Sequence, residues 1–260
     1  MAGYDDDLRF AHVLADAADA AALERFRSHD LSVTAKDDLT RVTDADKTVE
    51  ERIRGTLARS RPRDSVLGEE FGGTGSSPRC WVIDPIDGTE NYLRGVPAWA
   101  TLIALMDGND VMVGVVSAPA LNRRWWASIG SGTYAGRSLH SATRCRVSTI
   151  SEVSDAFFSY SGITEWDIAG RSAGFESLTR ACRRTRGFGD FWSYMLVAEG
   201  TVDIAAEPEV NLWDLAAVSL IVTEAGGRFT DLRGGPGPDG GSGLATNGPL
   251  HADVLELLAG

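Results

Sequence analysis

The sequence has few cysteines, few basic residues and no long apolar run, and each of these absences argues against a class of protein. It has three widely spaced cysteines, Cys80, Cys145 and Cys182, and no CxxC pair, which argues against a disulfide framework and a thiolate zinc site. It has 25 Lys and Arg against 37 Asp and Glu, which disfavours binding to nucleic acid or to anionic membranes. It lacks the run of ~18 apolar residues that spans a bilayer, and its acidic N-terminus is unlike a secretory signal. We therefore expect a cytoplasmic protein without nucleic acid or membrane partners.

Length and apolar content are sufficient for a large core. The 260 residues are 43% apolar, so we expect one large domain or two closely packed ones, at ~100–200 residues each. Apolar residues at three- and four-residue steps predict a helix over 8–26, and a second helix follows Thr43, with Thr43 or Asp44 available to cap it. Short β-rich runs then predict a sheet, at 66–67, 81–83, 101–106, 111–117 and 124–129.

The second half of the chain has a different pattern. From about Asp155, strand-like segments at 156–160, 186–189, 202–206, 228–231 and 244–246 alternate with helical segments at 168–180, 190–199, 213–225 and 251–258. Such alternation predicts an α/β lobe with a largely parallel sheet. We therefore expect an N-terminal α+β lobe over residues 1–145 and a C-terminal α/β lobe over residues 146–260.

The segment from Trp81 to Asn91 carries the strongest chemical signal. An apolar strand ends at Asp84, Pro85 turns the chain, and Asp87 follows before a Gly-Thr that can open a helix. This turn can direct two carboxylates and one backbone carbonyl at a single point, and hard oxygen ligands of this kind suit Mg²⁺. The amides at the helix start could hold phosphate beside the metal. The alternative is a surface turn with capping acids, because Asp-Pro and Asp-Gly are common in turns.

Two further acidic positions favour the metal site. Glu69 and Glu70 leave a strand-like segment together and would repel each other without a cation. Asp214 lies at the start of a predicted helix, where an acid faces the positive end of the helix dipole. Asp214 taken alone is compatible with a plain helix-capping role, but the combination with Glu69, Asp84 and Asp87 indicates a metal cluster.

These segments resemble the three sequence motifs of the inositol monophosphatase family, in order and in spacing. The motifs correspond here to Gly68-Glu69-Glu70, to residues 84–89 and to residues 213–217, and they span nearly the whole chain. The resemblance implies a layered α-β-α-β-α sandwich of the inositol monophosphatase and sugar phosphatase type. It also implies Mg²⁺-dependent hydrolysis of a small phosphate monoester between the two lobes, with two or three Mg²⁺ per site, in a homodimer.

The resemblance assigns roles to individual residues. The expected metal ligands are Glu69, Asp84, the Ile86 carbonyl, Asp87 and Asp214. Thr89 matches the family threonine that helps to orient the attacking water, and the amides of Gly88 and Thr89 are expected to bind phosphate. The remaining expected catalytic residues are Asp46, the partner acid of Thr89, together with Glu70 and Asp44, an additional acid that could reach a third metal through water.

Residues near the expected leaving group indicate the substrate. Glu207 lies seven residues before Asp214, where the family has an acid that contacts the substrate body, and Asp214 itself is expected to border the substrate. Asp190 stands where inositol phosphatases usually carry small or hydroxyl residues, and it is surrounded by aromatic residues, namely Phe188, Phe191, Trp192 and Tyr194. Acids and aromatic rings suit a cationic, planar group better than a neutral polyol.

Histidinol phosphate carries such a group, an imidazole together with an ammonium. Residues 91–101 and 190–209 also look like the bacterial histidinol-phosphatase branch of the family. We therefore expect hydrolysis of L-histidinol phosphate to L-histidinol and phosphate, a step of histidine biosynthesis.

Alternatives remain at this stage. Asp190 could be a helix N-cap and Trp192 a core aromatic. The function could be that of an inositol-1-phosphate or broad-specificity sugar-phosphate phosphatase, or the chain could be a metal-stabilised regulatory or assembly module with vestigial activity. No protein nucleophile is required, so we expect the four histidines to be structural or exposed: His12, His29, His140 and His251.

Overall fold

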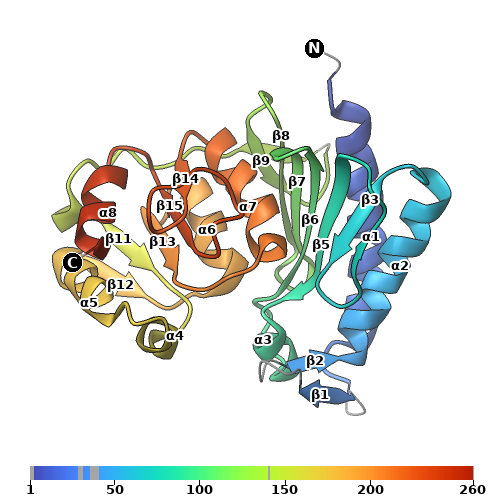
Figure 1. Cartoon of the computed structure of the whole chain (residues 1–260), viewed down its shortest axis with the longest axis horizontal. Coiled ribbons are helices and arrows are strands. Elements are labelled where there is room, and N and C mark those ends of the chain that lie inside the picture. The colour runs from blue at the N-terminus through green and yellow to red at the C-terminus, as the bar shows by residue number, and fades with distance from the viewer. Residues whose placement is uncertain (1–2, 29–31, 36–40, 140, 260) are drawn as a thin grey trace.

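Helices and sheets alternate in layers across the molecule (Figure 1). The computed structural model describes residues 3–28, 32–35, 41–139 and 141–259. In order, the layers are α1 (Asp5–Arg25) with α2 (Asp44–Ser60), an eight-stranded sheet, α6 (Asp190–Ala198) with α7 (Leu212–Glu224), a five-stranded sheet, and finally α4 (Ile163–Ile168), α5 (Ser172–Ala181) and α8 (His251–Ala259). The predicted α-β-α-β-α order is confirmed. None of the described helices combines the length and apolar character needed to cross a bilayer.

The two N-terminal helices form where the sequence predicts them. Helix α1 buries one face, made largely of alanine with Leu14, against the sheet and α2. Helix α2 begins after Thr43, whose side chain accepts hydrogen bonds from the amides of Ala45 and Asp46, while Asp46 accepts from the amide of Thr43 in return. This reciprocal capping box satisfies amides that have no partner within the helix. A short hairpin of β1 (Val33–Ala35) and β2 (Arg41–Thr43) precedes α2.

The eight-stranded sheet is antiparallel except where β3 pairs with β5. Its strands are, in spatial order, β10 (Ala142–Arg144), β9 (Thr133–Gly136), β8 (Arg123–Ser128), β7 (Asp110–Ala118), β6 (Ala100–Asp107), β5 (Arg79–Asp87), β3 (Ser65–Gly68) and β4 (Gly72–Thr74). Helices cover both faces. Trp81 and Ile83 of β5 therefore pack towards α1 and α2, whereas Val82 between them packs towards α6 and α7.

The five-stranded sheet is only partly parallel, so the sequence-based prediction of a largely parallel sheet is wrong in part. Its order is β12 (Arg184–Arg186), β11 (Phe157–Ser159), β13 (Ile204–Glu207), β15 (Gly243–Thr246) and β14 (Arg228–Thr230). Both neighbours of β11 are parallel to it, but β15 runs antiparallel to β13 and β14. The reason is that no helix lies between β14 and β15, and a loop returns the chain in the opposite direction.

Two smaller predictions also need correction. The helix expected at 168–180 is α5, which begins later, at Ser172, because Gly170 before it has a left-handed φ of 68°, and the preceding helix α4 was not predicted. The strand expected at 186–189 ends at Arg186.

The apolar core has three parts that follow the layers. One lies between α1, α2 and the large sheet, one between the large sheet and α6 and α7, and one between the smaller sheet and α4, α5 and α8. The middle part combines residues from both halves of the chain, for example Leu102 and Trp125 with Tyr194 and Leu215. Chain halves 1–145 and 146–260 therefore share a core, and their division into lobes stays a prediction.

Helix α7 packs directly on the backbone of the large sheet. A Cβ at Gly114 of β7 would lie 2.7 Å from the carbonyl oxygen of Ala217 and 3.2 Å from its Cα. Glycine is required there because any side chain would collide with the helix backbone. Ala217 lies about one helical turn beyond Asp214, so this contact also sets the position of that acid.

We expect Gly114→Ala to destabilise the protein by about 1–3 kcal/mol, because the added methyl group overpacks the contact between α7 and the sheet. The free energy of unfolding, measured by urea denaturation, checks this. Gly73→Ala is the matched control, since a Cβ there would come no closer than 3.8 Å to its nearest neighbour. The control should change the free energy by less than about 0.5 kcal/mol, and equal losses in both variants would contradict the packing argument.

Candidate active site

A break in the regular pairing of β5 brings two aspartates together. Strand β5 pairs regularly with β6 up to Asp84, and the register shifts between Asp84 and Asp87. The Asp84 carboxylate accepts a hydrogen bond of 3.0 Å from the Ile86 amide, and the Thr101 hydroxyl donates one of 2.8 Å to the Pro85 carbonyl. These bonds stabilise the bulge. In a regular strand, side chains three residues apart point to opposite faces, but the bulge lets Asp84 and Asp87 point to the same side.

Asp214 joins this pair from the other half of the chain. It lies in the first turn of α7, where its Oδ2 accepts a hydrogen bond of 2.7 Å from the Asn211 amide in a capping box. Carboxylate oxygens of Asp84, Asp87 and Asp214 all lie within 4.8 Å of one another. The structure thus brings together three of the acids predicted as metal ligands.

Their electrostatics favour a bound cation. Burial, followed by the charges of Glu69 and Asp87, raises the pKa of Asp84 well above its usual range. Burial also raises the pKa of Asp87 well above that range, with Asp190 and Asp214 adding to the shift. The pKa of Asp214 rises to about 7, mainly through burial and also through Glu69 and Glu207. Carboxylates this close cannot all carry charge without a counterion, and an all-oxygen donor set fits Mg²⁺.

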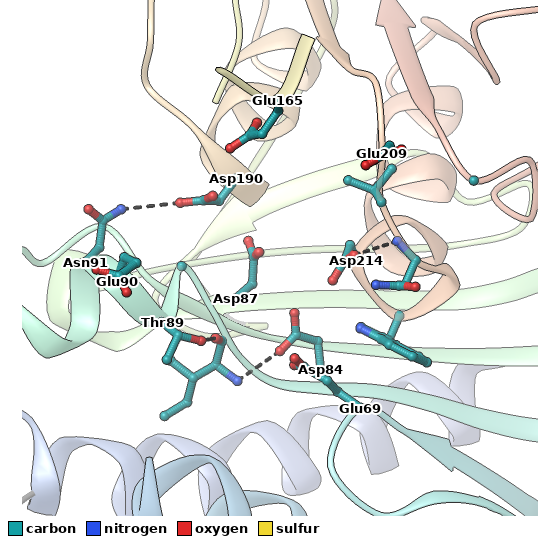
Figure 2. A pocket seen from close by; sticks show the side chains of 16 residues that line it. Glu69, Asp84, Asp87, Thr89, Glu90, Asn91, Glu165, Asp190, Glu209 and Asp214 are labelled. Atoms are coloured by element: carbon teal, nitrogen blue, oxygen red, sulfur yellow. Dashed lines mark hydrogen bonds between the residues drawn. The ribbon is translucent and has the colours of Figure 1, made fainter. Parts of the chain in front are cut away.

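Glu69 completes the acidic side of the site. It follows β3, and its amide donates to the Ile83 carbonyl at 3.2 Å, immediately before Asp84 in the neighbouring parallel strand. Parallel pairing therefore places the end of β3 beside the end of β5. Glu69 and the predicted ligands Asp84, Ile86, Asp87 and Asp214 line one cavity of about 1040 Å³, and Figure 2 shows four of these acids around it.

The turn after Asp87 borders the same cavity. Gly88 has a left-handed φ of 82° and precedes the short helix α3 (Thr89–Leu93), as the Gly-Thr pair predicts. Gly88 and Thr89 both line the cavity. The first amides of a helix have no partner within it and can bind an anion. The expected phosphate-binding residues are therefore beside the acids that could hold a metal.

A second group of acids lies next to this cluster. Asp190, at the start of α6, and Glu165 line the large cavity and also a smaller one of about 200 Å³, which Glu207 lines as well. Burial and the charges of Glu207 and Glu165 raise the pKa of Asp190 to about 7. Burial also raises the pKa of Glu207, whereas a hydrogen bond from Ser161 opposes that shift.

Asp190 connects the two halves of the chain. Its carboxylate accepts a hydrogen bond of 3.3 Å from the Asn91 side chain, as Figure 2 shows, and its amide donates to the Ser161 hydroxyl at 2.9 Å. Gly189 takes the N-cap position of α6, and Asp190 adopts a left-handed φ of 49°. This conformation is costly for a residue other than glycine and is typical of functional sites. The alternative of Asp190 as the N-cap is therefore wrong.

The structure does not make the expected bond between Thr89 and Asp46. The Thr89 hydroxyl donates to the Ile86 carbonyl at 3.0 Å. One carboxylate oxygen of Asp46 is taken by the capping box with Thr43, and the other is buried without a hydrogen-bond partner. The expected bond is absent because Asp46 is instead the N3 partner of Thr43 in the capping box of α2, a competing local role.

Two other predicted catalytic acids also lie outside the cavity lining. Asp44 pairs with Arg25 at 2.7 Å and accepts from the Ser32 amide at 3.3 Å. This arrangement does not support its expected reach to a third metal, since both carboxylate oxygens already have partners. Glu70 does not line the cavity, although its charge contributes to the raised pKa of nearby Asp46, which is about 7 chiefly because of burial.

The aromatic residues near Asp190 separate into two groups. Phe191 and Tyr194 line the smaller cavity. Trp192 instead packs against Phe188 at a ring distance of 5.5 Å, at the edge of the middle core, so its predicted place on a substrate surface is wrong. Helical periodicity explains the division, because consecutive residues of α6 point in different directions.

Sequence reasoning missed several lining residues. Glu165 and Glu209 are exposed acids that line both cavities. Glu209 is two residues beyond Glu207, and in an extended segment this spacing predicts that both side chains point to the same side. Nothing in the local sequence indicates that Glu165 lines the site, because the residue lies in the first turn of α4 and reaches the cavity only through the position of that helix in the fold.

The described histidines are buried away from this site. His12 contacts Arg124 and packs on Trp126, while His251 lies between the hydroxyls of Thr230 and Thr246. Burial is the main cause that lowers the pKa of both imidazoles to about 4. His29 and His140 lie outside the described residues.

Comparison with known proteins agrees with this geometry. A model of the inositol monophosphatase family matches residues 4–259. A histidinol-phosphatase of Streptomyces coelicolor is 60% identical, covering 99% of this chain and 98% of its own length. One of Mycobacterium tuberculosis is 54% identical, covering 97% and 98%. The solved structure of an inositol monophosphatase from Zymomonas mobilis superposes with a TM-score of 0.87 at 28% identity, covering 100% of both chains. This chain therefore belongs to the inositol monophosphatase family.

Proposed function

We propose that this protein is a Mg²⁺-dependent phosphatase that hydrolyses L-histidinol phosphate to L-histidinol and phosphate. The observation that carries the proposal is a single cavity in which the close cluster of Asp84, Asp87 and Asp214 lies next to a second group of acids around Asp190. The relatives from Streptomyces coelicolor and Mycobacterium tuberculosis named above support the choice of substrate. The homodimer implied by the family remains part of this proposal, and light scattering of the purified protein tests it.

The acid cluster would hold two or three Mg²⁺ ions. Their ligands would come from Glu69, Asp84, the Ile86 carbonyl, Asp87 and Asp214, since only hard oxygen donors are offered. When bound, Mg²⁺ would activate water and neutralise the charge of the phosphoryl group. The chain carries a formal net charge of −12, so without such neutralisation the site would repel an anionic substrate.

Residues of the turn after β5 would place the phosphate and the water. The amides of Gly88 and Thr89 would bind phosphate oxygens at the start of α3. The Thr89 hydroxyl donates its hydrogen bond to the Ile86 carbonyl, so its oxygen can accept a hydrogen bond from the attacking water and orient it. Asp46, buried beneath this region, would support the arrangement through the α2 cap rather than through a bond to Thr89.

The second group of acids would recognise the leaving group. Glu207 is buried, Asp190 is half-buried, and Glu165 and Glu209 are exposed acids that line the same cavities. A cationic ammonium or imidazolium would relieve the repulsion that raises the pKa of Asp190. A neutral polyol would not, and this difference favours histidinol phosphate over inositol phosphate.

We expect Asp84→Asn to lower turnover by at least ~10³-fold, because the substitution removes a charge at the centre of the acid cluster. Phosphate release from histidinol phosphate at saturating Mg²⁺ is the measurement. Glu176→Gln on the exposed surface of α5, where the acid pairs with Arg180, is the control and should retain full activity. Full wild-type turnover in excess chelator would contradict the metal dependence.

We expect Asp190→Asn and Glu207→Gln to lower kcat/KM for histidinol phosphate by about 10- to 150-fold each, the value of one charge-assisted hydrogen bond. Glycerol phosphate has no cationic group, so its hydrolysis by the same variants should change little. The two substrates are compared in parallel for each variant. Equal losses on both would mean that these acids support the fold or the metal site, and a wild-type preference for inositol-1-phosphate would contradict the proposed substrate.

A further inference from the structure

A fully buried glutamate that the proposed chemistry does not use lies directly behind the metal site. Glu50 of α2 is 0% exposed, which is unusual for a carboxylate unless all of its charge is compensated. Its Oε2 accepts from the Glu70 amide at 2.8 Å, and its Oε1 accepts from the Phe71 amide at 3.3 Å and from Arg54 Nε at 2.7 Å. Glu50 thus binds two consecutive amides of the turn between β3 and β4.

Arg54 extends this contact to the far end of the same turn. It lies one helical turn beyond Glu50 on the same face of α2 and forms an ion pair with it. Its guanidinium donates to the Gly72 carbonyl, and to the Thr74 hydroxyl at 3.3 Å. The Glu50–Arg54 pair therefore holds both the amides and a carbonyl of residues 70–74 against α2.

The Glu50 carboxylate fills the space beside Gly68, at the start of the turn. A Cβ at Gly68 would lie 2.0 Å from Glu50 Oε1 and 2.3 Å from its carboxyl carbon. Gly68 does not have a left-handed φ, so backbone conformation is not what requires glycine. The glycine before Glu69 is needed because the Glu50 carboxylate occupies the position of a side chain.

These contacts restrict the backbone of Glu69, because the amides on both sides of its Cα are hydrogen-bonded. Its own amide bonds the Ile83 carbonyl at 3.2 Å, and the next amide, that of Glu70, bonds Glu50. The backbone of Glu69 is therefore held from the sheet on one side and from α2 on the other. Its side chain lines the large cavity with Asp84 and Asp214.

We propose that Glu50, tied to Arg54, is a positioning residue that directs Glu69 towards the metal site and so sets the affinity of that site for Mg²⁺. The inference rests on the proposed role of Glu69 as a metal ligand. Neither side chain touches the cavity, so their effect passes through the backbone of the turn. Groups that orient metal ligands typically contribute about 10- to 100-fold to metal affinity.

Glu50→Gln tests the inference, because it keeps the size of the side chain and removes its charge. We expect Mg²⁺ binding, measured by calorimetry on the substrate-free protein, to weaken by about 10- to 100-fold. The Mg²⁺ concentration for half-maximal activity should rise in parallel, while KM at saturating Mg²⁺ should stay within about 3-fold. Hydrogen exchange at the Glu70 and Phe71 amides of the metal-free protein should become faster.

Glu51→Gln is the matched control, one residue along the same helix and exposed, and it should leave all of these quantities unchanged. Arg54→Met is a second variant for the case that Glu50→Gln does not fold, and it should weaken Mg²⁺ binding in the same direction. Wild-type Mg²⁺ affinity in a folded Glu50→Gln or Arg54→Met variant, even with a lowered Tm, would overturn the inference. A wild-type protein that binds Mg²⁺ but does not hydrolyse histidinol phosphate would overturn the proposed substrate alone.

Discussion

Repulsion among closely spaced carboxylates is the constraint on which the site depends. Asp84, Asp87 and Asp214 are held within 4.8 Å of one another, and burial together with neighbouring charge raises the pKa of each. Folding must therefore supply enough packing energy to bring these groups together, and a bound cation then relieves the cost. The middle core, which joins α6 and α7 to the large sheet, supplies that energy at the same place.

Each acid is held by a local device of its own. The bulge in β5 turns Asp84 and Asp87 to one point, the capping box of α7 orients Asp214, and the turn gripped by α2 carries Glu69. None of these devices needs the others in order to form. Their meeting depends on close packing, shown by the contact between β7 and α7 at Gly114, so a small shift of one layer would separate ligands without unfolding either half.

The second group of acids gives the cavity two electrostatically different ends. Near the β5 turn, amides at the start of α3 offer positive ends of dipoles. Near α6, Asp190 and Glu207 are carboxylates whose pKa burial raises. A substrate that is anionic at one end and cationic at the other matches this polarity, whereas a neutral polyol matches only half of it. The acids rather than Trp192 line these cavities, because Trp192 packs at the edge of the middle core.

The sequence by itself determined the helices with clear periodicity and caps, five of the eight strands of the large sheet, the layered fold through its family motifs, and most of the acids around the cavities. These features are local, since a cap, an apolar repeat or an Asp-Pro turn acts within a few residues. Tertiary structure decided the direction of β15 and the role of Asp44, whose side chain pairs with Arg25. It also placed Glu165 at the cavities and Glu50 against the turn that carries Glu69. Their partners are distant in the chain or are backbone groups. Neither contacts between distant residues nor hydrogen bonds to backbone amides can be recognised from the amino-acid sequence.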